Sequence, residues 1–585
     1  MKKKSIILFL ITLVVLCHIG QSVEAANYTY TSSDMPSSKT FVAGDVIILK
    51  NGDWSNKSNI TIKGAGTASA RISVKAETAG SVIFKGNSRL TIDGTYIEVE
   101  GIEFSGNSSV GTSHVITFSK SSSYCRLTNS AIRDYNPSNS TSWASTDNKW
   151  VSINGTYNRV DHCYFENKAN IGTLLVVWLV SGQSANHRID NNHFFKRIPL
   201  LDSSNKELNG QETIRVGDSN TSMTYANCII ENNFFEKCDG EIEIISNKSC
   251  GNLYKNNVFY DNNGMITLRH GNACTVDGNY FIGKSQSGTG GVRIIGEDHK
   301  VYNNYFQDLL GSGYRTAVCI VKGKTNSALN EYFQVKNALV VFNTLYNCKN
   351  GFNVGYDGGA NLAPISTTIA HNVVFAKTTG QVGVQISDSK SEITWVNNLM
   401  YQGKHTSFTP TDAQFRRITT DLNFQSTNAT YGIYQPTSSS VIATQYKTSE
   451  YPDINTDIEG RPRPSEKVIG AFELTGNTTL AMPTPGTIGC SFINKTGTGT
   501  EIPTIKKSDT LVSRLNISNN KLYVQSNVDE LSLQIYDLKG ALKSSQSVTA
   551  LGNDFIFNLS EQLNGLHIFV FETEKIRDTR KLVVY

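Results

Sequence analysis

The 585-residue sequence has little proline, little cysteine and almost no net charge. It contains 12 Pro and 10 Cys, and 54 Lys and Arg against 50 Asp and Glu leave a formal charge of +4. Hydrophobic residues make up 39% and charged residues 18% of the chain, which excludes a disordered or collagen-like protein and allows a large core. A chain this close to neutrality gives no reason to expect a nucleic-acid partner.

Long apolar runs are also missing, apart from one at the N-terminus. There, residues 6–17 follow three lysines and precede the small-residue sequence Val23-Glu24-Ala25, which is the pattern of a secretory signal. No later run reaches the roughly 18 apolar residues that a membrane helix needs. We therefore expect residues 1–25 to be a signal peptide and the mature protein to be soluble outside the cytoplasm, without a membrane span.

Closely spaced cysteine pairs are absent as well. Nine cysteines follow residue 25, none of them in a Cys-x-x-Cys arrangement, and several lie in apolar runs. This spacing does not fit a zinc site. We expect most of these cysteines to be small buried hydrophobic residues, with at least one thiol unpaired because nine is an odd number.

An imperfect repeat occupies the middle of the chain. Segments such as IDNNHFFK (189–196), IENNFFEK (230–237) and VYNNYFQD (301–308) share an apolar residue, a polar pair often ending in Asn, and then aromatic residues. The second polar residue recurs every 22 to 41 residues, at His162, Asn192, Asn233, Asn257, Asn279, Asn304, Asn343, Asn372 and Asn398. The shortest intervals, 22 to 25 residues, fit one coil of a stacked β solenoid.

Short alternating runs lie between the repeat positions. Examples are ETIRVG (212–217) and MITLRHG (265–271), which predict strands with one buried face, and no long helical pattern competes with them. The fold class we predict is all-β, a right-handed parallel β-helix, in which stacked coils bury an apolar face that one coil cannot bury and each Asn bonds to the Asn of the next coil. Propellers and sandwiches are the alternatives, with different repeat or strand spacings.

The repeat intervals also locate side loops. The two longest intervals precede Asn233 and Asn343. The additional residues predict loops on the side of the solenoid, where a working cleft is usually built.

The composition changes near residue 475. We predict a β-helix catalytic domain over 26–475, a linker over 476–510, and a small antiparallel β sandwich over 511–585. The last region resembles the C-terminal sorting domain of the type IX secretion system of Bacteroidetes, in the motifs IYDLKG (535–540), LNGLHIFVFE (563–572) and KLVVY (581–585). The resemblance implies contact with that secretion machinery and a secreted or cell-surface location. A carbohydrate-binding or spacer module is the alternative.

Charged residues recur at matching positions of the predicted strands. With Ile242 and Ile244 pointing inward, alternation places Glu241 and Glu243 outside. The same parity and a separation of about one coil predict a single exposed column, formed by Arg215, Glu243, Arg269 and Arg293. The alternative is a set of ordinary surface salt bridges.

A pair of carboxylates in this column indicates a cation site. Glu241 and Glu243, about 6.6 Å apart along a strand, repel each other unless a cation lies between them. Hard oxygen ligands suit Ca²⁺, and Asn209 in the preceding coil offers an amide oxygen. Lys248 follows the pair in the turn Ser-Asn-Lys-Ser.

Three motifs together resemble polysaccharide lyase family 6, which includes alginate lyases and the dermatan-cleaving chondroitinase B. They are N-x-x-x-x-I-R-x-G (209–217), E-x-E-I-I-x-x-K-S (241–249) and R-H-G (269–271). The resemblance implies Ca²⁺-assisted β-elimination at a uronic acid residue. By position it implies Asn209, Glu241 and Glu243 as Ca²⁺ ligands, Lys248 as the base, Arg269 as the acid or leaving-group partner, and Arg215, His270 and Arg293 in the substrate site. For His270, a structural hydrogen bond to the next coil is an equal alternative.

These observations predict a secreted lyase that cleaves alginate into oligosaccharides ending in an unsaturated uronate. Arg293 and Ile295 offer a cation and an aliphatic surface, which suit an unsulfated polyuronate. A dermatan sulfate lyase and a non-catalytic polysaccharide-binding surface protein are the alternatives. A pectinase-type hydrolase is disfavoured, because the sequence has no Asp-Asp pair and no Gly-His-Gly.

Overall fold

A computed structural model describes residues 25–493, except 285, 357 and 358, and most of the strand residues between 514 and 584. The chain divides into two compact units, Met1–Lys495 and Thr496–Tyr585, which are described separately. The predicted signal peptide lies outside the described residues, apart from its last position. Within the described part of the chain, no helix has the length and hydropathy needed to span a bilayer.

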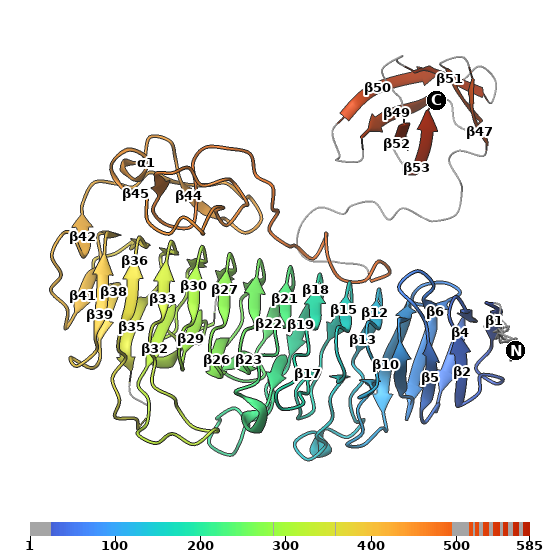
Figure 1. Cartoon of the computed structure of the whole chain (residues 1–585), viewed down its shortest axis with the longest axis horizontal. Helices are drawn as coiled ribbons and strands as arrows, with labels where there is room; N and C mark the ends of the chain where they lie inside the picture. Colours follow the sequence, from blue (N-terminus) through green and yellow to red (C-terminus); the bar gives the residue numbers. More distant parts are fainter. Residues whose placement is uncertain are drawn as a thin grey trace, which may run out of the picture. The chain divides into compact units, whose positions relative to one another are not determined.

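The first unit is a parallel β-helix built from three sheets of 14 strands, to which each full coil gives one strand per sheet. Figure 1 shows the coils stacked along the longest axis, from the blue N-terminal strands to the yellow ones. The first sheet contains β2 (Ser38–Val42), β5 (Ile60–Ala65), β8 (Leu90–Thr95), β11 (Ile116–Phe118), β14 (Val151–Ile153), β17 (Leu175–Val177), β20 (Ile214–Gly217), β23 (Glu243–Lys248), β26 (Met265–His270), β29 (Val292–Ile294), β32 (Val318–Val321), β35 (Asn350–Tyr356), β38 (Val382–Ile386) and β41 (Lys404–Thr406).

The other two sheets follow in each coil. The second contains β1 (Asn27–Tyr30), β3 (Val46–Leu49), β6 (Ile72–Ala76), β9 (Ile97–Glu100), β12 (Arg126–Thr128), β15 (Arg159–Asp161), β18 (Arg188–Asp190), β21 (Ile229–Glu231), β24 (Leu253–Lys255), β27 (Thr275–Asp277), β30 (Lys300–Tyr302), β33 (Leu339–Val341), β36 (Thr367–Ala370) and β39 (Ile393–Val396). The third contains β4 (Gly52–Ser55), β7 (Val82–Gly86), β10 (Ile102–Ser108), β13 (Ala131–Arg133), β16 (Tyr164–Glu166), β19 (His193–Arg197), β22 (Phe234–Cys238), β25 (Val258–Tyr260), β28 (Tyr280–Ile282), β31 (Tyr305–Gln307), β34 (Thr344–Tyr346), β37 (Val373–Phe375), β40 (Asn398–Tyr401) and β42 (Phe415–Ile418). The predicted β-helix is confirmed.

The core is formed by inward-facing side chains that stack from coil to coil. One row consists of parallel phenyl rings with centroids 4.7 to 5.1 Å apart: Phe165, Phe194, Phe235, Phe259, Phe281 and Phe306. All nine cysteines after residue 25 are buried. They pack as small apolar residues, as predicted.

The repeated asparagine forms a buried ladder. The side-chain amide of each member donates to the Oδ1 of the next at 2.9 to 3.0 Å, from Asn192 through Asn233, Asn257, Asn279, Asn304, Asn343 and Asn372 to Asn398. At the start of the ladder the predicted position is wrong by one residue. The backbone N–H of Cys163 donates to Asn192 Oδ1 at 2.9 Å, whereas His162 occupies the left-handed turn before it.

Loops and a C-terminal cover complete the first unit. The predicted side loops are confirmed: residues 198–213 precede β20, and residues 322–338 follow β32. Residues 419–475 pack over the third sheet through a second apolar core (Figure 1). This cover includes β43 (Phe424–Ser426), β44 (Tyr434–Pro436), α1 (Val441–Gln445), β45 (Lys447–Thr448) and β46 (Lys467–Val468).

The first part of the predicted linker lies against the solenoid. Cys490 is fully buried beside Ala131 and Tyr164, and the backbone N–H of Gly489 donates to the carbonyl of Asn191 at 2.8 Å. The prediction of a linker from residue 476 therefore differs from the structure up to residue 493. A Thr- and Gly-rich composition does not distinguish a free linker from a chain held by backbone hydrogen bonds.

The second unit is composed of antiparallel strands. Three form one sheet, β47 (Arg514–Ser518), β48 (Lys521–Gln525) and β51 (Asp554–Asn558). Four form another, in the order β50 (Leu542–Thr549), β49 (Glu530–Tyr536), β52 (Gly565–Glu572) and β53 (Arg577–Val584). The sorting role remains a prediction.

Replacing Asn279 with alanine tests the asparagine ladder. The change removes the acceptor of the Asn257 backbone and side-chain amides, and a buried donor left unpaired costs about 1–3 kcal/mol. We expect a clear fall in the midpoint of chemical denaturation. Asn107, which is exposed, serves as the control, and equal effects of Asn279→Ala and Asn107→Ala would show that the ladder contributes little.

Two buried histidines predict acid sensitivity of the fold. Burial lowers the pKa of His187 from 6.5 to about 3 and that of His299 to about 4. Below pH 6.5 the unfolded chain therefore binds more protons than the folded chain does. The contribution of each ring to the free energy of unfolding is fully present above this pH, and about 3 kcal/mol of it is lost as the pH drops toward 4.

His299→Asn isolates one of these contributions. His299 Nδ1 accepts from the backbone of Cys274, as Asn252 Oδ1 accepts from that of Cys228 at the same turn two coils earlier. Asparagine thus keeps the acceptor but does not titrate. We expect denaturation midpoints of the variant to depend less on pH between 4 and 6.5, and an unchanged slope would contradict the assignment.

Candidate active site

The predicted site residues gather on the first sheet, where they span its width. Glu241 and Glu243 lie where the chain enters β23, and Lys248 is the last residue of that strand. Arg269 ends the neighbouring strand β26 with His270. Carboxylates therefore lie toward one edge of the sheet, and the lysine and arginine toward the other.

The predicted column of stacked charges is wrong in register. Arg215 pairs with Ser246, Ser246 with Thr267, and Thr267 with Arg293. Glu243 is level with Met265 instead, because β23 contains irregularities between Glu243 and Ile245 and between Asn247 and Lys248. Sequence spacing near one coil could not reveal these bulges, since each shifts the alternation of the residues that follow it.

Burial of the carboxylates also differs from the prediction. Ile245 is level with Ile214 and Ile266 in the core, and Ile244 is buried as well. Glu241 and Glu243 are each only 8% exposed rather than lying on an open surface. A buried carboxylate requires compensating partners.

Glu243 has such partners. Arg293 donates from Nη2 to Oε1, Ser246 donates from Oγ to Oε2, and Arg269 Nε lies 3.8 Å from Oε1. Burial by itself would raise the pKa of Glu243, but Arg293, Ser246, Lys248 and Arg269 outweigh it and hold the pKa below its usual value. Glu243 is therefore an anion at neutral pH.

Glu241 lies in the opposite electrostatic situation. Burial, followed by the neighbouring charges of Glu212 and Glu243, raises its pKa to about 9. Without a cation, ionising Glu241 would place a third negative charge in this buried cluster.

Glu212 belongs to the site, although the sequence analysis did not select it. Its Oε2 accepts a hydrogen bond from Thr173 Oγ1 at 2.7 Å, and its Oε1 lies 3.9 Å from Lys248 Nζ. Its exposed fraction is 3%. The available signal was its place inside the motif that begins at Asn209.

The cationic side chains are fixed by aromatic rings and a side loop. Arg269 donates to the backbone carbonyls of Glu331 and Asn330 at 2.9 and 3.3 Å and lies 4.4 Å from the ring centroid of Tyr332. Arg293 lies 5.1 Å from the ring of Tyr314. Loop 322–338 thus fixes the guanidinium group of Arg269 on the outer face of the first sheet.

His270 and Arg215 flank this centre. His270 is buried, pairs in register with Lys248, and has Nδ1 3.4 Å from Ser219 Oγ. Burial, followed by Arg269 and Lys248, lowers its pKa to about 4, so the ring is neutral at pH 7. The Arg215 guanidinium lies 5.1 Å from the ring of Trp178, one coil before the carboxylates.

Three buried polar atoms of the register row indicate a ligand. Arg215 Nε, Thr267 Oγ1 and Arg293 Nε have no hydrogen-bond partner among the described residues. Buried polar groups are rarely left unpaired. This row is therefore suited to a polar ligand or ordered water.

Asn209 is separate from the others. It lies exposed in loop 198–213, and within the described residues no hydrogen bond joins it to Glu241 or Glu243. Over the same residues, no three His, Cys, Asp or Glu side chains converge closely enough to hold a metal ion by themselves. The two glutamate carboxylates nevertheless have the donor chemistry that a hard cation prefers.

Three solved structures show the same fold with moderate sequence identity. The PL6 family alginate lyase AlyGC is 28% identical with a TM-score of 0.66, and the match covers 82% of this chain and 60% of AlyGC. A mannuronic acid specific family 6 lyase from human gut microbiota is 27% identical with a TM-score of 0.57, covering 68% of this chain and 92% of the other. The PL6 family polysaccharide lyase Pedsa3628 from Pseudopedobacter saltans is 27% identical with a TM-score of 0.54, covering 67% and 96%.

The sequence comparisons agree with the fold. No curated protein matches the chain. The family profile described as Chondroitinase B matches residues 35–450, which is well over half of the sequence. The chain spans about 60% of the length of AlyGC, and it belongs to the Chondroitinase B family.

Proposed function

We propose that this protein is a polysaccharide lyase of family 6, and that it cleaves alginate by β-elimination and leaves an unsaturated uronate at the new non-reducing end. The observation that carries the proposal is that Arg269 and Arg293 both approach the carboxylate of Glu243. Lys248, at the end of the same strand as Glu243, lies beside Glu212. Alginate lyases among the structural neighbours support the substrate.

Lys248 is the proposed base. The reaction removes the proton on carbon 5 of the uronate, and a lysine accepts it only in the neutral form. Lys248 Nζ lies 3.9 Å from Glu212 Oε1, and the side chain is 20% exposed, so it is placed between the carboxylates and a bound sugar.

Arg269 is the proposed leaving-group partner. Two backbone carbonyls and the Tyr332 ring orient its guanidinium, so its charge is already in place when the oxygen on carbon 4 departs. Arginine stays protonated at working pH, which favours electrostatic stabilisation over proton donation. Neutral His270 and cationic Arg215 and Arg293 would contact the substrate from either side.

Ca²⁺ is the proposed cofactor, held by Glu241 and Glu243 with Asn209. When bound, it would neutralise the uronate carboxylate and so favour the charge that develops next to it. The raised pKa of Glu241 fits a carboxyl group whose ionised form needs such a cation.

Dermatan sulfate is the second candidate substrate, because the matching family profile bears the name Chondroitinase B. The aliphatic surface expected from Ile295 is not available, because Ile295 is fully buried, and Arg293 pairs with Glu243. We favour alginate because alginate lyases are among the similar solved structures. Secretion or surface attachment through residues 1–25 and 511–585 also belongs to the proposal, supported by the signal pattern and the terminal motifs.

A substrate panel tests the reaction and the cofactor. We expect the full chain to raise the ultraviolet absorbance of alginate, polymannuronate or polyguluronate solutions, and a chelator to abolish the rise until Ca²⁺ is restored. If the absorbance rises only with dermatan sulfate, then dermatan sulfate rather than alginate is the substrate. Full activity in chelator would remove Ca²⁺ from the proposal.

Lys248→Ala tests the base. We expect kcat to fall by about 10²–10⁴-fold, the usual contribution of a positioned base, with the melting temperature unchanged because Lys248 is outside the apolar core. Lys300→Ala, an exposed lysine of the second sheet, is the matched control. Near-native turnover by Lys248→Ala would exclude the assignment.

A further inference from the structure

Three tyrosines form an exposed stack on the N-terminal coils. Tyr96, Tyr124 and Tyr157 occupy the same turn between the first and second sheets, with ring centroids 4.8 and 4.7 Å apart and planes within 5°. Tyr124 is 40% and Tyr157 47% exposed.

The backbone of this turn does not favour tyrosine. All three residues have φ between 51° and 56°, the left-handed region that suits Asn and Gly. The next two coils place Asn186 and Asn227 there. Aromatic side chains at a costly backbone position indicate a role for the rings themselves.

A row of arginines runs beside the tyrosines. Arg126, Arg159 and Arg188 are register partners at the starts of β12, β15 and β18. Each is held by a carboxylate, with Nη2 at 2.6 Å from Asp161 in the first case and 2.5 Å from Asp190 in the second.

These ion pairs leave the guanidinium groups outermost. Asp161 and Asp190 have 0% exposed side chains, whereas Arg126, Arg159 and Arg188 are 29%, 34% and 48% exposed. Within the described chain, Arg159 Nη1 donates no hydrogen bond. The surface therefore presents fixed cationic donors.

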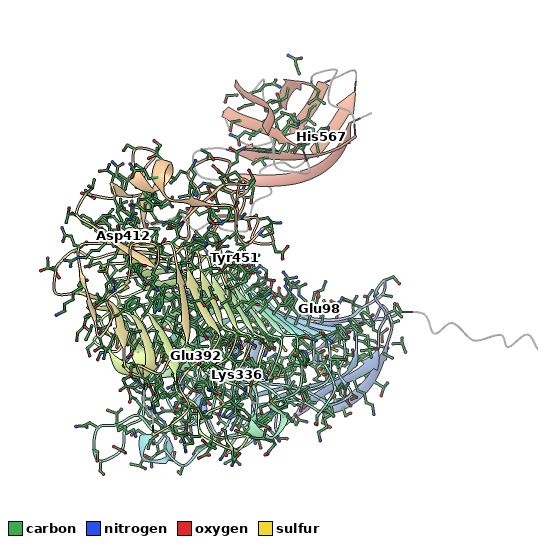
Figure 2. The ribbon with its side chains drawn as sticks, turned by 60° about the vertical axis from the view of Figure 1, so that its left-hand side comes forward. Glu98, Lys336, Glu392, Asp412, Tyr451 and His567 are labelled. Carbon is green, nitrogen blue, oxygen red and sulfur yellow. The ribbon has the colours of Figure 1, made fainter. Side chains whose placement is uncertain are left out.

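A groove of about 290 Å³ separates the two rows. Arg71 contributes to its lining, lying 5.5 Å from the Tyr96 ring and donating to the carbonyl of Tyr124 at 2.9 Å. Glu98, labelled on the N-terminal coils in Figure 2, lines it too.

A second cavity lies where the chain leaves β11, β14 and β17 of the first sheet. It measures about 300 Å³ and is lined by Lys120, Asn154, Trp178 and Val180, among others. Trp178 also packs under Arg215, and β17, β20 and β23 are successive neighbours. The path from Lys248 through Arg215 and Trp178 to the tyrosines follows one edge of the first sheet.

We propose that the two cavities and the tyrosine stack form an extended binding surface for the uronate polysaccharide, beyond the residues that react. The inference rests on the proposed function. Each coil adds one ring and one guanidinium at the strand spacing of about 4.8 Å, so the surface repeats as a polymer does. Because the stacked rings cover one another's faces, a sugar would pack against their exposed edges and against the outer face of Tyr157. The guanidinium groups would pair with its carboxylates.

The test uses Tyr124→Asn/Tyr157→Asn, because asparagine is the residue of the following coils at this turn and should keep the fold. We expect KM for polymeric alginate to rise about tenfold with kcat unchanged, and kcat/KM for short oligosaccharides to stay the same. The double Phe variant, which retains both rings, should behave as the unmodified chain.

Binding measured without turnover separates this inference from the proposed function. In gels containing alginate, polygalacturonate or neutral dextran, we expect the anionic polymers to retard the unmodified chain more than the Asn double variant. If no uronan is cleaved but the anionic polymers still retard the unmodified chain more than the Asn double variant, the binding surface is supported and the proposed function is wrong. Equal retardation of both proteins by the anionic polymers, with equal KM, would show that the tyrosines serve only the fold. Retardation of the unmodified chain by dextran as strong as by alginate would contradict a surface for anionic polymers.

Discussion

Parallel hydrogen bonding between successive coils is the constraint on which the rest of the molecule depends. A single coil exposes its apolar face and an unpaired strand edge, and both are satisfied only by the next coil. The asparagine ladder carries the same condition into the turns, since each amide has its acceptor one coil further on. The stacking therefore fixes where the side chains of different coils lie relative to one another, even when they are far apart in the sequence.

This rigidity explains how charges can be concentrated at the active site. Glu212, Glu241 and Glu243 come from two neighbouring coils, and burial, followed by the charges of Glu212 and Glu243, raises the pKa of Glu241. The same scaffold holds Arg293 and Arg269 against Glu243 and lowers its pKa. Without a bound cation, two glutamates two residues apart thus differ in protonation at neutral pH because of their surroundings.

Much of this fold could be predicted from the sequence, because a sequence motif that recurs once per coil indicates that the coils stack. Asn192 to Asn398 occupy the expected ladder, whereas His162 was one residue off because its copy of the repeat has Cys163 at the ladder position. The sequence motifs identified residues of the site, but they did not predict which of these residues lie level with one another on neighbouring strands. Bulges around Glu243 and Lys248 have no signature in alternating hydrophobicity, and the contact of Tyr332 with Arg269 depends on how a long loop folds back.

The lengths of the coils provide a physical reason for the position of the site. Between Asn233 and Asn304 the repeat intervals are 22 to 25 residues, which leaves little beyond three strands and their turns. Lys248 and Arg269 belong to these short coils, so nothing of their own coil covers them. The additional residues belong to the coils on either side, and loop 198–213 supplies Glu212 and Asn209 while loop 322–338 supplies Tyr332. Short coils between two long ones place Lys248 and Arg269 between two side loops without any change in the core. The length of these loops can therefore vary while the stacking beneath Lys248 and Arg269 stays the same.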